Sequence, residues 1–157
     1  SEMTEDLQRW HHTFSAAAHN EAMDIFYANE ATWDEIQSLI ELAHVAHWHW
    51  MQRTDREPKN ESVALWVLSR AYSANGYGDQ ALRYAKLSLT TIENENLLPS
   101  FYGYSNEALA RAYALQGDGD LAKLHLDRAF EIAKIVPNAQ AKEYLLDQIN
   151  RIKLGGV

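Results

Sequence analysis

Cysteine is absent from this 157-residue chain, which excludes a disulfide framework and any thiolate metal site. The absence suits a reducing compartment, and we expect a cytoplasmic protein. No run of about 18 apolar residues occurs, so we expect no membrane-spanning helix and no membrane partner. The first residues show no basic segment followed by an apolar stretch, and we therefore expect no signal peptide.

Basic residues are scarce in the first part of the chain. Neither lysine nor arginine occurs between Arg9 and Arg53, and the formal net charge of the whole chain is −8. Because affinity for phosphates needs basic clusters, we expect no nucleic-acid partner. The acidic half is either a solvated surface that aids solubility or a face that attracts basic partners.

Proline is also rare, with three residues, and the few glycines are clustered. Strand signals are absent, whereas apolar residues recur at helical spacing along almost the whole chain. These patterns predict an all-α fold.

A repeat becomes visible when the chain is aligned with itself. "LSRAYSANGYGDQA" (68–81) and "LARAYALQGDGDLA" (109–122) agree at eight of fourteen positions, at an offset of 41 residues. This density of matches at one offset predicts a repeated helical hairpin. Gly76 is expected to end its helix as a left-handed C-cap. Gly117 is expected to do the same one repeat later.

Small and acidic residues follow each of these glycines. We expect Asp79 and Asp120 to cap the second helix of each hairpin, because aspartate is a favoured N-cap residue. Ala81 and Ala122 are small enough to let that helix approach its partner closely.

The two segments resemble the tetratricopeptide repeat (TPR), whose pattern places Leu, a small residue, Tyr, Gly and Ala along two antiparallel helices. The matching positions are Leu68, Ser69, Tyr72, Gly76 and Ala81, and then Leu109, Ala110, Tyr113, Gly117 and Ala122. The resemblance covers residues 62–136. It lacks the proline that usually ends each repeat, and its 41-residue spacing exceeds the usual ~34.

The resemblance implies a TPR-like right-handed superhelix of about three antiparallel hairpins plus a C-terminal capping helix. We expect one domain, 1–157, with a degenerate hairpin at 4–53, repeats at 60–94 and 100–136, and a capping helix at 138–153 before Gly155 and Gly156. The degenerate hairpin carries Trp10, Phe14, Met23 and Phe26 at helical spacing.

Polar residues at the expected helix starts support these boundaries. Thr32 and Glu35 have the spacing of a capping box. Asn60 and Asn138 are expected N-caps of the helices that follow them.

The stretch "AHVAHWHW" (43–50) is rich in histidine and tryptophan. On a helix, His49 points roughly 140° from His44 and 160° from His47, so one ion cannot reach all three rings. His44 and His47 could chelate as an i,i+3 pair, but the other ligands would have to come from elsewhere. We expect packed rings with no metal and no cofactor. His44, His49 and Trp50 form a possible pocket.

The resemblance also implies that the first helix of each hairpin faces a concave groove. The groove positions are Val63, Trp66, Arg70 and Ser73 in one hairpin and Tyr104, Glu107, Arg111 and Ala114 in the next. We expect a partner to contact Trp66, Arg70, Tyr104, Glu107 and Arg111. Arg70 and Arg111 occupy one repeat position and could hold a carboxylate or phosphate. Alternatively, Glu107 neutralises both and joins the two hairpins.

No catalytic pattern stands out. The sequence has no GxSxG, no phosphate-binding loop and no dinucleotide fingerprint, so we expect no catalytic residues and no enzyme. We expect a TPR-like binding or scaffold module that recognises a protein or peptide through the groove, where an anionic group of the partner could contact Arg70 and Arg111. The alternative is a protein that responds to a small molecule, anion or metal through a His/Trp/Arg pocket. The sequence does not indicate the oligomeric state.

Overall fold

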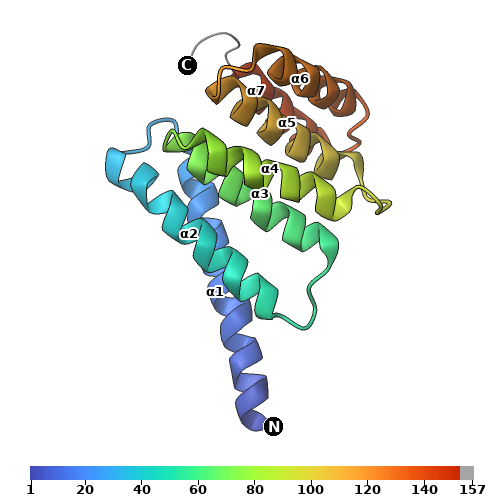
Figure 1. Cartoon of the computed structure of the whole chain (residues 1–157). Helices are drawn as coiled ribbons and strands as arrows, with labels where there is room; N and C mark the ends of the chain where they lie inside the picture. The colour runs from blue at the N-terminus through green and yellow to red at the C-terminus, as the bar shows by residue number, and fades with distance from the viewer. Residues whose placement is uncertain (153–157) are drawn as a thin grey trace.

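The computed structural model describes residues 1–152, and within them it contains seven α-helices and no strand (Figure 1). The all-α prediction is confirmed for this part of the chain. The helices are α1 (Glu2–Tyr27), α2 (Trp33–Gln52), α3 (Pro58–Ala74), α4 (Gly78–Ile92), α5 (Pro99–Leu115), α6 (Gly119–Lys134) and α7 (Ala139–Asn150). None of these described helices combines the length and the apolar character needed to cross a bilayer.

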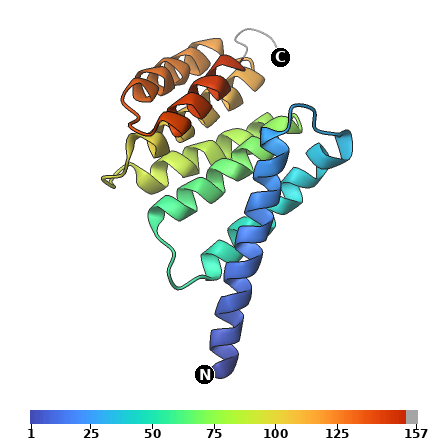
Figure 2. The same ribbon diagram turned by 180° about the vertical axis from the view of Figure 1, so that it is seen from behind.

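Consecutive helices pack in pairs. α1 packs on α2, α3 on α4 and α5 on α6, while α7 lies against both α5 and α6. The pairs correspond to the expected hairpins at 4–53, 60–94 and 100–136. The odd-numbered helices also contact one another in order, from α1 to α3, α5 and α7, and Figure 2 shows α1 and α7 in front on this side.

The expected capping helix at 138–153 corresponds to α7, which ends at Asn150. Residue 153 and the two glycines at 155 and 156 lie outside the described residues.

The core is built largely from small residues at the helix crossings. Ala81 and Ala122 are fully buried, as their place in the repeat predicts, and so are Ala71 and Ala112 on the partner helices. Because alanine projects only a methyl group, the backbones of each pair can approach closely, and the larger Leu68 is also fully buried.

Both repeat hairpins turn in the same way. Gly76 and Gly117 have φ of 81°, in the left-handed region, so the C-cap prediction is confirmed. In the first turn the N–H of Tyr77 donates to the carbonyl of Tyr72 at 3.0 Å, and the N–H of Gly76 donates to that of Ser73 at 3.0 Å. These bonds satisfy two carbonyls at the end of α3.

The prediction that Asp79 and Asp120 are N-caps is wrong. α4 begins at Gly78 and α6 at Gly119, so both aspartates lie in the first helical turn. There they face the positive end of the helix dipole without capping it. Asp118 caps α6 instead, through its side chain.

Of the other predicted caps, two are present and one is not. The capping box at Thr32 is confirmed, and Asn138 caps α7. Asn60 is not an N-cap, because Pro58 begins α3 two residues earlier and leaves Glu57 as the cap. The Asn60 side chain instead accepts a hydrogen bond from the N–H of Glu57 at 3.1 Å.

The left-handed turns give a first prediction. Gly76→Ala and Gly117→Ala should each lower the free energy of unfolding by about 1 kcal/mol, because alanine is strained at positive φ. Urea denaturation at neutral pH measures the change. Gly119→Ala is the matched control, since that residue does not have a positive φ and has open space around its Cα. A comparable loss in the control would mean that the strain argument is wrong.

Candidate functional site

A cavity of about 140 Å³ lies between the odd-numbered helices, with a further contribution from α4. We call it the tyrosine pocket. Its aromatic and aliphatic lining residues are Met23 and Tyr27 from α1, Val63 and Trp66 from α3, Phe101 and Tyr104 from α5 and Tyr144 from α7. The pocket therefore combines side chains from all three hairpins and from the C-terminal helix.

Aromatic rings surround the pocket in a continuous series. The ring centroids of Tyr27 and Tyr144 are 4.8 Å apart, those of Tyr144 and Tyr104 are 6.0 Å apart, and those of Tyr104 and Trp66 are 5.4 Å apart. Burial raises the pKa of Tyr104 to about 12, and the nearby phenols and Glu107 act in the same direction. The phenol is therefore neutral at physiological pH.

The inner wall of the pocket consists of three serines from three helices. The Ser62 hydroxyl donates to the carbonyl of Ser88 at 2.8 Å, and the hydroxyls of Ser88 and Ser105 are hydrogen-bonded at 2.8 Å. His19 of α1 also lines the pocket, and burial lowers the pKa of its ring. The histidine is thus neutral at pH 7, and the pocket presents no charged wall.

The indole of Trp66 also contacts a charged network formed by Glu107, Arg70 and Arg111. The Glu107 side chain is completely buried, and its carboxylate accepts hydrogen bonds from Arg111 Nε at 3.0 Å and from Trp66 Nε1 at 3.2 Å. Arg70 Nη1 lies 3.5 Å from the same carboxylate. Burial acts to raise the pKa of Glu107, but the two arginines and their hydrogen bonds outweigh it and hold the pKa below its ordinary value. The network joins α3 to α5.

α7 and the end of α1 cover this network. Arg70 Nη2 donates to Gln148 Oε1 at 2.8 Å, and Arg111 Nη2 donates to the Gln148 carbonyl at 3.3 Å. The Arg70 guanidinium also lies 5.1 Å from the ring centre of Phe26. Only 8% of the surface of Arg70 is exposed.

The expected partner-binding groove at Trp66, Arg70, Tyr104, Glu107 and Arg111 stays a prediction, and the structure places these residues in two different environments. Trp66 and Tyr104 do reach the pocket wall, but Arg70 and Glu107 are buried. The reason is that the capping helix docks on top of the charged groups. Of the two arrangements that the sequence left open, the geometry is that of Glu107 bridging both arginines.

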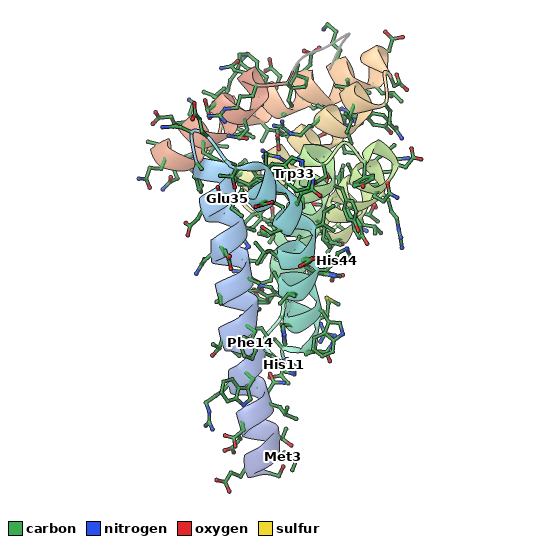
Figure 3. The ribbon with its side chains drawn as sticks, turned by 90° about the vertical axis from the view of Figure 1, so that its left-hand side faces the viewer. Met3, His11, Phe14, Trp33, Glu35 and His44 are labelled. Carbon is green, nitrogen blue, oxygen red and sulfur yellow. The ribbon has the colours of Figure 1, made fainter. Side chains whose placement is uncertain are left out.

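The structure directs the side chains of His44, His49 and Trp50, the predicted pocket, to different neighbours. His44 Nε2 is hydrogen-bonded to the Tyr72 hydroxyl of α3 at 2.7 Å, whereas His49 Nδ1 is hydrogen-bonded to His11 Nδ1 of α1 at 2.9 Å. Trp50 lies under the guanidinium of Arg53, the residue that follows α2. α2 packs between α1 and α3, so its side chains reach different neighbours (Figure 3 labels His11 and His44).

Among the described residues none of the hydroxyls of the tyrosine pocket is hydrogen-bonded to a histidine or a carboxylate, so no nucleophile is paired with a base there. Within residues 1–152 no three histidine or carboxylate side chains cluster closely enough to hold a metal ion.

Sequence reasoning missed the contribution of α1 and α7. His19, Met23 and Tyr27 are spaced four residues apart and line one side of the pocket, while Tyr144 closes it from α7. The four-residue spacing is a signal that these three side chains share a face. Neither helix belongs to the aligned repeat, however, so the alignment does not indicate which helices that face would meet.

Comparisons of the chain with protein-family models, with curated proteins and with solved structures give no match.

The buried bridge gives a second prediction. Glu107→Gln should lower the free energy of unfolding by about 3 kcal/mol, because it leaves two buried arginines without their carboxylate. Arg70→Met and Arg111→Met should each cost about 1–3 kcal/mol, since Glu107 retains one arginine in either variant. Lys123→Met is the control, because Lys123 pairs with Asp127 at an exposed i,i+4 position. Urea denaturation should show almost no change in the control.

The same variants have a defined pH dependence. The folded-state pKa of Glu107 lies below its ordinary value of 4.5, so its stabilisation is present at neutral pH and is lost as the pH falls through that lower pKa. The stability difference between wild type and Glu107→Gln should therefore be constant from pH 7 to about 5 and shrink only below about 4.5. A difference that shrinks already between pH 7 and 6 would contradict this assignment.

Proposed function

We propose that the chain is a non-catalytic, TPR-like binding module that takes one bulky apolar side chain of a protein or peptide partner into the tyrosine pocket. Two observations support the TPR-like description: the 41-residue repeat, and the packing of successive helices as pairs. The observation that carries the proposed function is the neutral, aromatic-lined cavity between α1, α3, α5 and α7.

The size of the cavity favours a side chain over a larger ligand. Sites for drug-sized molecules span roughly 300–1,000 Å³, whereas an apolar cavity of about 150 Å³ accommodates a single benzene ring. The tyrosine pocket, at about 140 Å³, belongs to the second class. A phenylalanine, leucine or methionine side chain has the matching size.

The rim of the tyrosine pocket is open enough for the rest of a peptide to continue outside when one of its side chains is bound. Tyr27 is 59% exposed and packs at a tilt of 49° against Tyr144, so the rim remains in contact with solvent. Aromatic residues around a small pocket are typical of the positions that contribute most of the binding energy in protein interfaces. The arginines do not carry this proposal, because Glu107 and Gln148 already engage them.

A third prediction tests the proposed function with selected peptides. Peptides enriched from a random displayed library should share one large apolar residue, and replacing it with alanine should weaken binding by at least about tenfold. Val63→Phe should abolish binding, because the larger side chain fills the cavity that Val63 lines. Calorimetry with synthetic peptides measures both effects.

Val45→Phe is the matched control, since Val45 is exposed on α2 and does not line the pocket. Binding that survives Val63→Phe, or is lost equally in both variants, would contradict the proposal. Failure of all peptides together with pocket-dependent binding of indole would instead favour the small-molecule alternative.

A further inference from the structure

The N-terminal half of α1 carries four large apolar side chains on its surface. Met3 is 74% exposed, Leu7 51%, Trp10 56% and Phe14 44%. Successive members are separated by four, three and four residues, which places them in one stripe along the helix. The Trp10 and Phe14 rings stack with their centroids 5.6 Å apart. We call these four residues the α1 stripe.

Met3 and Leu7 lie beyond the end of α2, whereas Trp10 and Phe14 lie alongside α2 and remain exposed, although the Phe14 ring is 5.4 Å from the His49 ring. α2 returns along α1 only as far as Gln8, whose side-chain amide donates to the carbonyl of Gln52 at 3.0 Å. The first turns of α1 therefore extend beyond the rest of the molecule, as Figures 1 and 3 show, with Met3 near the projecting end. Within residues 1–152, the aromatic contacts of α1 with helices other than α2 lie at its C-terminal end, where Phe26 approaches Trp66 of α3 and Tyr27 approaches Tyr144 of α7.

We propose that the α1 stripe is a self-association surface that pairs with the stripe of a second copy of this chain in antiparallel orientation. The spacing of four, three and four is the same in both directions, so a two-fold axis between residues 8 and 9 superimposes one stripe on the other. Met3 then lies opposite Phe14 of the second copy, and Leu7 lies opposite its Trp10.

Side-chain size favours this orientation. Each antiparallel contact joins a large ring to a smaller, flexible or branched side chain, which allows close packing. A parallel pair would place Trp10 against Trp10 and Phe14 against Phe14, and would leave Met3 and Leu7 with smaller partners.

The charges of α1 also favour the antiparallel orientation. Glu2, Glu5 and Asp6 lie at the start of the helix, and Arg9 is its only arginine or lysine. A parallel pair would bring the acidic turns of both copies to the same level, where they repel. An antiparallel pair separates these turns and places each beside the later, less acidic part of the other helix.

The area of the stripe sets the strength of the interaction. The four side chains expose on the order of 400–500 Å², which resembles the largest apolar patches of monomeric proteins. Covering the stripe in two copies would remove roughly 1,000 Å² from water, near the lower limit for a specific interface. We therefore expect a reversible dimer with a dissociation constant in the micromolar range.

Sedimentation of the full chain from ~1 to 200 μM tests the inference. The wild-type chain should shift from monomer to dimer over this range, and Trp10→Glu should raise the dissociation constant at least about tenfold. Trp33→Glu is the matched control, because Trp33 is 72% exposed on α2 and the substitution introduces the same charge. Circular dichroism should show equal helix content for both variants. A wild-type monomer at every concentration, or a dimer unaffected by Trp10→Glu, would overturn the proposal.

The absence of cysteine allows the orientation to be tested directly. Under oxidising conditions the double variant Met3→Cys/Phe14→Cys should form a covalent dimer, whereas Met3→Cys alone should not, because the two Met3 positions lie at opposite ends of an antiparallel pair. A rapid covalent dimer of Met3→Cys alone would overturn the antiparallel register.

Discussion

The completely buried carboxylate of Glu107 is the constraint on which the arrangement of α3, α5 and α7 depends. An isolated buried carboxylate would cost several kcal/mol, so the chain must keep Arg111, Arg70 and the Trp66 indole N–H within reach of it. Arg70 and Arg111 in turn require acceptors, and Gln148 of α7 supplies one to each. Satisfying one charge therefore fixes the spacing of three helices, and it holds Trp66 as the wall of the tyrosine pocket.

The network also shows how a repeat acquires a specific site. Arg70 and Arg111 are equivalent in the repeat, and so are Trp66 and Glu107, which lie 41 residues apart. The first pair has arginine in both hairpins. The second pair has the Trp66 indole in one hairpin and the Glu107 carboxylate in the other. The indole donates to the carboxylate across the helix interface. The departure from the repeat, more than the repeat itself, creates the asymmetric centre beside which the pocket forms.

Local chemistry explains which parts of the fold the sequence could predict. The helices and the Gly76 and Gly117 turns follow from spacing and from a backbone conformation that glycine adopts freely, so they were predicted correctly. The first residues of α3, α4 and α6 were missed because a proline or a second glycine, rather than the nearest Asn or Asp, begins each helix. The burial of Arg70 and Glu107 depends on the docking of α7 from far along the chain, which no local pattern encodes. The angular spread of the histidines was predictable, but their partners Tyr72 and His11 belong to other helices.

α1 connects the two proposals. Its C-terminal half supplies Met23 and Tyr27 to the pocket, while its N-terminal half carries the exposed stripe. In an antiparallel pair with its axis between residues 8 and 9, each pocket lies about 22 Å from the axis along the helix, at 1.5 Å per residue. The two pockets are then about 45 Å apart, a distance that an extended chain spans with about 13 residues. A partner with two large apolar residues at that separation or more could occupy both pockets at once, and the second contact would be strengthened by the first. A partner with a shorter separation would gain nothing from the dimer, so self-association through α1 would select for partner length as well as for the apolar side chain.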